Sequence, residues 1–111
     1  MFSLLKPFIF KIDPEMAHDL AIRSLKYNFL PEDIFKVENE EILETEIFNT
    51  KIKNPIGLAA GFDKSAEVYN SLFRFGFGFI EVGTVTPKKQ FGNPKPRVFR
   101  LENDRALINR L

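Results

Sequence analysis

The sequence predicts an α/β protein in which two N-terminal helices precede a β-α-β unit. Apolar residues recur at helical spacing over residues 2–27. Short apolar runs at residues 55–60 and 79–82 then flank a helical pattern at 64–75. An unbroken apolar run is typical of a strand buried on both faces, so we expect these two strands to be parallel and joined by the helix between them.

An apolar stripe predicts the two N-terminal helices. Pro7 is expected to limit where the first helix begins, because proline fits best in a first turn. Asp13 as the N-cap and Pro14 at the first helical position predict a second helix from about Pro14 to about Tyr27. The stripe is either ordinary core, which the pattern alone favours, or a surface that faces a membrane or lines a tunnel. Its residues are Phe2, Leu5, Phe8, Ile9, Ile12, Met16, Ala17, Leu20, Ala21 and Leu25.

The middle of the chain predicts a loop, a hairpin and then the β-α-β unit. Residues 28–41 should be a loop, with a short helical turn near residues 32–35. Residues 42–53 partly alternate in polarity, which indicates a hairpin with its turn at Asn49-Thr50. In the helix at 64–75 we expect one buried side, with Gly76 ending the helix. The residues of that buried side are Val68, Leu72 and Phe75.

Residues 91–96 should form a loop, after which residues 97–101 and 106–109 can pair as a second hairpin around Asn103-Asp104. Basic residues gather in this late part of the chain, and they are expected to be a solvated loop with some phosphate or carboxylate contacts. They are Lys88, Lys89, Lys95, Arg97, Arg100, Arg105 and Arg110.

Composition excludes several classes of function. The chain has 111 residues, 44% of them apolar, which suffices for one small domain with a core. A net charge of +1 gives no reason to expect nucleic acid. The absence of cysteine and the single His18, interpreted as structural, argue against a metal site and a serine-histidine triad.

No stretch approaches the ~20 apolar residues of a spanning helix. Lys6 and Lys11 interrupt the N-terminal apolar segment, and no cleavage site follows it, so a secretory signal is a poor interpretation. We expect a cytoplasmic protein that rests on a membrane face.

The ends of the two parallel strands predict a ligand site. Residues 60–64 and the pair Gly83-Thr84 follow the carboxyl ends of these strands, where α/β barrels and open sheets place their ligands. Gly61 and Gly83 permit close backbone approach. Lys64 beside a flavin would stabilise the anion formed on reduction. On spacing alone, Lys64 as the plain start of a helix and Thr84 as the plain end of a strand are equally good interpretations.

Several collinear motifs resemble one family, the class 2, quinone-dependent dihydroorotate dehydrogenases. The resemblance covers the whole chain, because residues 13–18 also match the family's N-terminal helical extension. The motifs are Asp13-Pro-Glu-Met-Ala-His18, Asn54-Pro-Ile-Gly-Leu-Ala-Ala-Gly-Phe-Asp-Lys64, Gly76-Phe-Gly-Phe-Ile-Glu-Val-Gly-Thr-Val-Thr-Pro87, Gly92-Asn-Pro-Lys-Pro-Arg97 and Ile108-Asn-Arg-Leu111.

The resemblance implies a TIM (β/α)₈ barrel preceded by a helical domain. Residues 1–41 would be a helical, membrane- and quinone-associated extension with its linker, and residues 42–111 the start of an FMN-binding TIM barrel, truncated and incomplete. The implied reaction oxidises (S)-dihydroorotate to orotate in pyrimidine (UMP) synthesis, with hydride transfer to FMN and reoxidation by a quinone. The stripe would then be a quinone entrance and membrane face, which implies a peripheral protein on the cytoplasmic side of the membrane.

The resemblance also assigns roles to particular residues. Those implied to contact FMN are Ala60, Gly61, Phe62, Asp63, Lys64 and Thr84, and those implied to bind the substrate are Lys64, Asn109, Arg110 and Leu111.

The family pattern continues beyond the end of this chain. A closed barrel needs about 250 residues, and the serine that acts as general base, with most of the FMN phosphate site, lies past Leu111 in the family; Ser65 does not match that position. We therefore expect no turnover from the chain alone. Two alternatives are a non-catalytic membrane- or quinone-binding module and a non-functional remnant of the enzyme.

Overall fold

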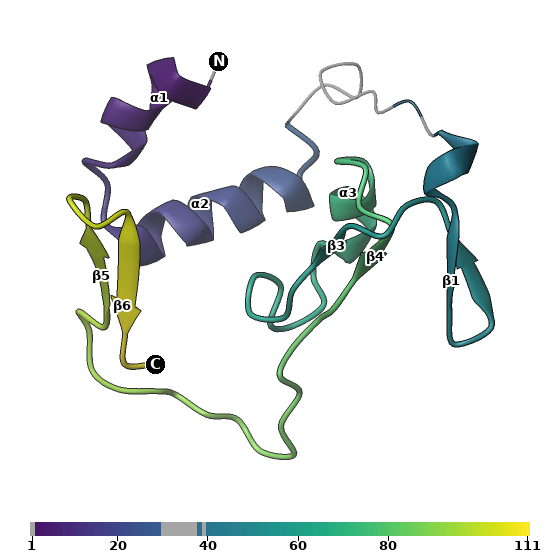
Figure 1. Cartoon of the computed structure of the whole chain (residues 1–111). Coiled ribbons are helices and arrows are strands. Elements are labelled where there is room, and N and C mark those ends of the chain that lie inside the picture. The colour runs from purple at the N-terminus through teal and green to yellow at the C-terminus, as the bar shows by residue number, and fades with distance from the viewer. Residues whose placement is uncertain (1, 30–37, 39) are drawn as a thin grey trace. The chain divides into compact units, whose positions relative to one another are not determined.

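The structure is a computed structural model that describes residues 2–29, 38 and 40–111 (Figure 1). Helices and strands are mixed in it, as the sequence predicts. It divides into two compact units, Met1–Ala21 with Thr86–Leu111, and Ile22–Val85. The helical turn expected near residues 32–35 lies outside the described residues. In chain order the elements are α1 (Phe2–Ile9), α2 (Pro14–Lys26), a 3₁₀ turn (Glu41–Leu43), β1 (Thr45–Ile47), β2 (Thr50–Ile52), β3 (Gly57–Leu58), α3 (Tyr69–Phe73), β4 (Phe79–Ile80), β5 (Val98–Leu101) and β6 (Ala106–Asn109).

The start of α2 confirms the predicted cap. Asp13 Oδ1 accepts hydrogen bonds from the backbone amides of Glu15 and Met16, both at 3.0 Å. Pro14 follows at the first helical position, where its missing amide costs nothing. The sequence therefore predicted the start of this helix correctly and its end to within one residue.

The position of Pro7 contradicts the prediction for α1. The helix begins at Phe2, so Pro7 lies within it and not in its first turn. Proline removes one hydrogen bond to the carbonyl four residues earlier. The cost is limited because α1 ends two residues later, and the Phe10 amide still donates to the Lys6 carbonyl at 2.9 Å.

Most of the predicted apolar stripe is exposed, which contradicts its interpretation as core. Phe8 is 70% exposed, Leu20 is 49% exposed, and Leu25 alone among the described stripe residues is fully buried. The neighbours of Leu25 all belong to the second unit. No helix within the described residues is long and apolar enough to cross a membrane.

The second hairpin forms as predicted. β5 pairs antiparallel with β6, with Val98 opposite Asn109 and Leu101 opposite Ala106. Arg97 makes a carboxylate contact of the kind expected of the late basic residues, whereas Arg100 differs because it binds backbone carbonyls. Arg97 pairs with Glu15, and Arg100 Nη1 donates to the carbonyls of Phe10 and Ile12 at 3.1 and 2.6 Å.

The first hairpin has its turn one residue earlier than predicted. β1 and β2 pair with Ile47 opposite Thr50, which leaves Phe48 and Asn49 as the two turn residues. Both have positive φ, 49° and 60°, as the favoured two-residue hairpin turn requires. Thr50 belongs to β2. Phe48 is an unusual residue for this conformation, and its side chain is 97% exposed.

A parallel pair of strands and one short helix form the centre of the second unit (Figure 1). β3 pairs with β4 in parallel, Gly57 opposite Phe79 and Leu58 opposite Ile80, as the β-α-β pattern predicts. The strands are shorter than the apolar runs predicted. Beside them lies the core of this unit, formed by Leu25, Val68 and Leu72, with Ile22, Leu58, Phe62, Phe75 and Ile80 packed against it.

Helix α3 is shorter than predicted. It begins at Tyr69, whereas the pattern indicated a start at Lys64, because the preceding residues form turns in which Ala66 has φ +55°. The helix also ends earlier than predicted, with Arg74 as its C-cap, and Gly76 follows two residues later with φ +88°. Val68 and Leu72 are buried and Phe75 is half-buried, as predicted.

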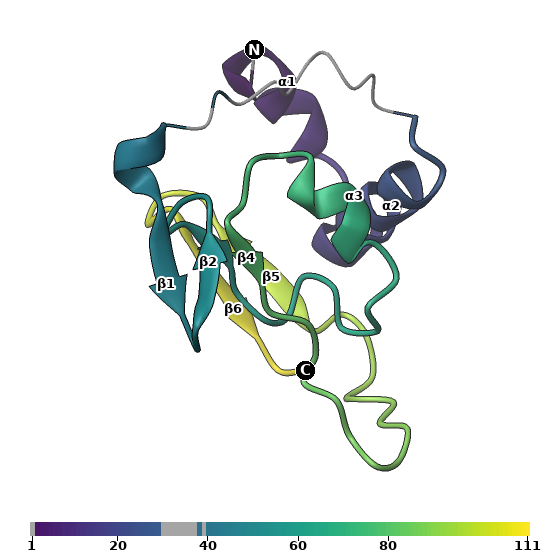
Figure 2. The ribbon, with the colours of Figure 1, turned by 90° about the vertical axis from the view of Figure 1, so that its right-hand side faces the viewer.

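The last turn of α2 is fastened to α3 (Figure 2). Ser71 Oγ donates to the Leu25 carbonyl at 3.0 Å, and Arg74 Nη1 donates to Asn28 Oδ1 at 2.8 Å. Lys26 Nζ lies 2.7 Å from Glu67 Oε2. One of these contacts, that of Ser71, reaches a backbone carbonyl in the last turn of α2, where the helix leaves carbonyls without helical partners.

The Lys26–Glu67 pair predicts a pH dependence. The hydrogen bond and the charge of Glu67 raise the pKa of Lys26 above its ordinary value of 10.5. Because the pKa of Lys26 is raised in the folded state, the stabilisation of the fold by this pair is complete below the unfolded-state pKa of Lys26. It is lost as pH rises through the folded-state pKa. We expect Glu67→Gln to lower the pKa of Lys26, measured by NMR titration of its ammonium group. An unchanged titration midpoint would contradict the pair.

Candidate functional site

The structure brings the two predicted strand ends together. The Gly61 amide donates to the Gly83 carbonyl at 3.0 Å, and the Gly83 amide donates to the Asp63 carbonyl at 3.2 Å. These bonds continue the β3–β4 pairing, in which the Glu81 amide donates to the Leu58 carbonyl at 2.9 Å. The segments around Gly61 and Gly83 therefore form one surface at the carboxyl end of the parallel pair, which is where such sheets bind ligands.

Asp63 has a structural task at this surface. Its two carboxylate oxygens accept hydrogen bonds from the backbone amides of Glu67 and Val68, each at 2.8 Å. The residue is only 2% exposed. A buried carboxylate that is fully occupied by two amides does not reach a ligand through its side chain. The FMN contact predicted for Asp63 stays a prediction.

Lys64 and Thr84 offer the polar groups of the site. Both are exposed, and in the described part of the chain Lys64 makes no hydrogen bond or ion pair. Thr84 follows the Gly83–Thr84 peptide bond, which is cis. Gly61 has φ +108°, and a Cβ added to it would meet no heavy atom within 4 Å. The surface thus combines open space at a glycine, a cationic side chain and a hydroxyl, a set that fits a flat anionic group.

Ala60 and Phe62 complete the predicted cofactor segment. Ala60 is exposed and Phe62 is half-buried against the core of the unit. Asn109, Arg110 and Leu111 belong to the other unit. All three are exposed. Arg110 Nη2 donates to the Pro96 carbonyl at 3.1 Å, so part of its guanidinium is already bound within the unit.

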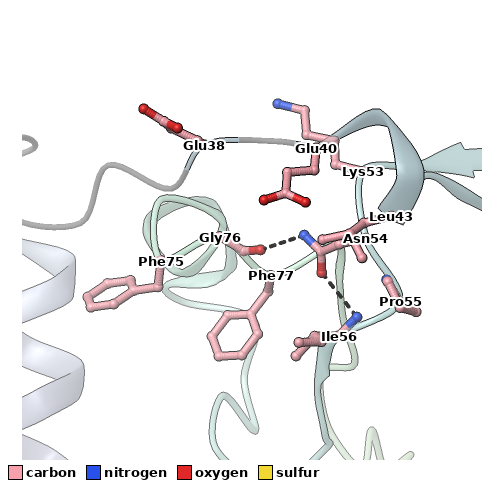
Figure 3. A pocket seen from close by; sticks show the side chains of 10 residues that line it. All are labelled: Glu38, Glu40, Leu43, Lys53, Asn54, Pro55, Ile56, Phe75, Gly76 and Phe77. Atoms are coloured by element: carbon pink, nitrogen blue, oxygen red, sulfur yellow. Dashed lines mark hydrogen bonds between the residues drawn. The ribbon is translucent and has the colours of Figure 1, made fainter.

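A pocket of about 280 Å³ has a wall formed by Asn54, Phe75 and Phe77, among other residues (Figure 3). Asn54 stands in its wall, donating from Nδ2 to the Gly76 carbonyl at 2.8 Å and accepting at Oδ1 from the Ile56 amide at 3.0 Å. Its amide is therefore used to join the start of β3 to the end of α3. A second pocket, of about 650 Å³, is lined by residues 50–53 and 73–80, and neither of the two contains a predicted site residue.

Sequence reasoning missed two roles in this unit. The residues that carry them are Asn54, which joins α3 to β3, and Asp63, which caps the backbone before α3. An aspartate side chain often hydrogen-bonds to backbone amides a few residues away, and this tendency could have indicated a structural role for Asp63. The bond from Asn54 to Gly76 spans 22 residues and has no local sign.

Comparison with known proteins gives a consistent result. The family model described as dihydroorotate dehydrogenase matches residues 42–111. The chain is 51% identical over 99% of its length to a dihydroorotate dehydrogenase (quinone) from Xanthobacter autotrophicus, of which it covers 30%. It is 52% identical over 89% of its length to a mitochondrial dihydroorotate dehydrogenase (quinone) from Mus musculus, of which it covers 25%.

Solved structures show the same similarity. A crystal structure of DHODH from Eimeria tenella in complex with ferulenol matches with a TM-score of 0.78 and 48% identity, covering 87% of this chain and 25% of that one. A ligand-free DHODH from the same organism matches with a TM-score of 0.79 and 48% identity, covering 88% of this chain and 26% of that one. This chain thus spans about a quarter to a third of the proteins that it resembles.

Proposed function

Because this chain belongs to the dihydroorotate dehydrogenase family, we propose that it supplies the N-terminal part of an enzyme that oxidises (S)-dihydroorotate to orotate and reduces a quinone, a step of pyrimidine synthesis. The observation that carries the proposal is the hydrogen bond between the two strand ends at Gly61 and Gly83, with the exposed Lys64 close to them in the sequence. The sequence identity of about 50% to quinone-dependent relatives supports dihydroorotate as the substrate and a quinone as the electron acceptor.

We propose FMN as the cofactor of this surface. FMN supplies a group that takes hydride from dihydroorotate and gives electrons to a quinone. Lys64 holds a positive charge where negative charge develops, and its exposure leaves it free to approach both cofactor and substrate. The open space at Gly61 admits a flat group close to the backbone, and Thr84 offers a hydroxyl. Asn109, Arg110 and Leu111 would bind the substrate from the second hairpin.

The proposed architecture is the beginning of a TIM barrel after a helical extension. β3, α3 and β4 form a parallel β-α-β unit, the repeating element of such barrels. A two-stranded sheet is only marginally stable by itself, so further strands beside this pair are physically reasonable. The family match begins at residue 42, which supports a boundary between an extension at 1–41 and a barrel part at 42–111.

The exposed apolar side chains of α1 support a membrane and quinone role for the extension. Leu4, Leu5 and Phe8 are 75%, 49% and 70% exposed, and Lys6 lies among them. Amphipathic helices with flanking lysines lie in the membrane interface. The proposed location is therefore peripheral, on the cytoplasmic side of a membrane.

Replacing Phe8 by alanine tests the membrane role. If the Phe8 side chain is buried in the lipid interface, its loss should weaken binding of the chain to phospholipid vesicles about tenfold or more. The measurement is co-sedimentation with vesicles that contain anionic lipid. Phe48→Ala is the matched control, because Phe48 is also exposed but lies in the β1–β2 turn. Equal effects of the two substitutions, or no binding by the unchanged chain, would contradict the role of α1.

A chimera tests the catalytic proposal. The chain replaces the matching 110 residues of the Xanthobacter relative, and oxidation of dihydroorotate by a soluble quinone is measured. We expect turnover from the chimera and none from residues 1–111 alone, because the family's general base and most of its FMN phosphate site lie outside this chain. Turnover by residues 1–111 would overturn that statement, and an inactive, well-folded chimera that fails to bind FMN would overturn the proposed function.

In the chimera, Lys64→Ala should lower kcat/KM about tenfold to 100-fold, because one stabilising charge is lost from the site. Lys88→Ala is the matched control, since this exposed lysine lies outside the proposed site. We expect the two substitutions to differ in their effect on kcat/KM. Equal values of kcat/KM for both variants would show that Lys64 has no catalytic role.

A non-catalytic membrane- or quinone-binding module is the second candidate function, favoured by the exposed apolar side chains of α1. It predicts vesicle binding that depends on Phe8, together with a folded chimera that has no turnover. A non-functional remnant predicts neither.

A further inference from the structure

One carboxylate and one guanidinium join the first turn of α2 to the segment before β5. Glu15 Oε1 accepts a hydrogen bond from Arg97 Nε at 2.9 Å, across 82 residues of sequence. The two side chains are only 14% and 19% exposed. Lys95 Nζ lies 3.5 Å from the same oxygen, with a more exposed side chain. A largely buried, charge-assisted hydrogen bond of this kind is stronger than an exposed ion pair and fixes geometry.

Arg97 carries the connection onward to the end of the chain. Its Nη1 donates to the Phe91 carbonyl at 3.0 Å and lies 3.5 Å from the Asn93 carbonyl. Asn93 Nδ2 in turn donates to the Arg110 carbonyl at 2.7 Å. The Arg110 amide donates to the Arg97 carbonyl at 2.9 Å. Glu15, Arg97, Asn93 and Arg110 therefore form one continuous set of contacts within a single unit.

Arg100 adds a second fastening between the same elements. Its Nη1 donates to the Phe10 and Ile12 carbonyls, which lie between α1 and α2. Its guanidinium also lies 5.0 Å from the centre of the Phe10 ring. Arg97 therefore binds the first turn of α2, and Arg100 binds the segment between α1 and α2. Both arginines join these parts of the chain to the second hairpin.

We propose that Glu15, Arg97 and Asn93 are positioning residues, which fix residues 109–111 from the first turn of α2. Asn109, Arg110 and Leu111 are the proposed substrate residues of this unit, so the functional meaning of this inference rests on the proposed function. The contacts among Glu15, Arg97, Asn93 and Arg110 do not depend on that function. A displacement of α2 is then transmitted to the substrate residues through Arg97, although α2 itself contributes none of them.

Gly92 offers a way to move Arg97 without changing any charge. A Cβ added at Gly92 would overlap Nη1 of Arg97, the nitrogen that donates to the Phe91 carbonyl, while Nε of the same side chain donates to Glu15. Gly92 also has φ +71°, so alanine there is mildly strained. Gly92→Ala should therefore have the same local effect as removal of the Glu15 carboxylate, by a different physical route.

NMR measurement of exchange with water tests the inference in the 111-residue chain. The probes are the Arg110 amide, the Asn93 side-chain amide and the Arg97 Nε–H. We expect Glu15→Ala and Gly92→Ala each to speed exchange at these probes about tenfold. Glu67→Ala is the matched control, because it removes the carboxylate of another lysine pair in the other unit. It should leave all three probes unchanged.

Two outcomes would overturn the positioning role. One is unchanged exchange at Arg110 in both variants. The other is an equal rise at the paired amides of Leu101 and Ala106, which would indicate general loosening of the hairpin.

The chimera gives a kinetic measurement that a purely structural role would not change selectively. Glu15→Ala should raise KM for dihydroorotate about fivefold while kcat changes less. A change in kcat alone would contradict positioning of the substrate residues. If the unmodified chimera is well folded but inactive and fails to bind FMN, the proposed function fails, whereas the exchange measurement still decides whether Glu15 positions Arg110.

Discussion

Replacing Asp63 by alanine is expected to lower the free energy of unfolding of the Ile22–Val85 unit by about 3 to 4 kcal/mol. The substitution removes two hydrogen bonds to a carboxylate and leaves the amides of Glu67 and Val68 without their acceptors. Val68 is buried, so water does not replace the lost bond at its amide without cost. The unit has a small core, so a loss of this size is a large share of its stability.

Urea unfolding, followed by circular dichroism and by the amide signals of residues 22–85, measures this loss. Asp104→Ala is the control, because Asp104 is exposed in the β5–β6 turn and should change stability by no more than about 0.5 kcal/mol. Asp63→Asn should have an intermediate effect, because the amide keeps one acceptor oxygen and turns a donor toward the other N–H. If Asp63→Ala matches the Asp104 control, the buried cap is not what stabilises the start of α3.

Gly78→Ala is the second large effect, with an expected cost of about 3 kcal/mol or more. A Cβ at Gly78 would overlap the backbone carbonyl of Asn54, and a backbone atom cannot move aside as the end of a side chain can. The Gly78 amide donates to the Ile56 carbonyl at 2.8 Å, and Asn54 donates to the Gly76 carbonyl. Alanine should separate these two segments and break both bonds at the point where β3 and β4 begin to pair.

Gly61→Ala separates this overlap from the general cost of replacing glycine. Gly61 has open space around it, so alanine there should cost only about 1 to 2 kcal/mol, from its positive φ. The measurement is urea unfolding of the two variants under the same conditions. Similar losses in both would show that the close approach at Gly78 does not decide the stability of the parallel pair.

Local features of the sequence predicted much of the fold. Asp13 and Pro14 act within one turn of helix. The pairing of residues 97–101 with 106–109 needs only a short turn between two apolar stretches. In each of these cases the interacting groups lie within a few residues, so spacing and residue type contain the necessary information.

The errors arose where distant or competing contacts decide the structure. The β1–β2 turn includes Phe48, a residue with no preference for positive φ, because the register of the two strands places it there. Asp63 caps two amides and so delays the start of α3 to Tyr69, against the helical pattern that begins at Lys64. Most of the stripe on α1 and α2 is exposed because the described residues pack little against it.

By itself the sequence determined the bounds of α2, the parallel β-α-β unit, the second hairpin and the family, because these follow from local spacing and from collinear motifs. It also predicted that the ends of β3 and β4 meet, since parallel strands share one carboxyl edge. Only the tertiary structure decided that Asp63 faces inward, that Asn54 joins β3 to α3, and that Glu15 reaches Arg97. The path of the folded backbone brings these residues together or orients them. Their spacing along the sequence does not indicate that they are in contact.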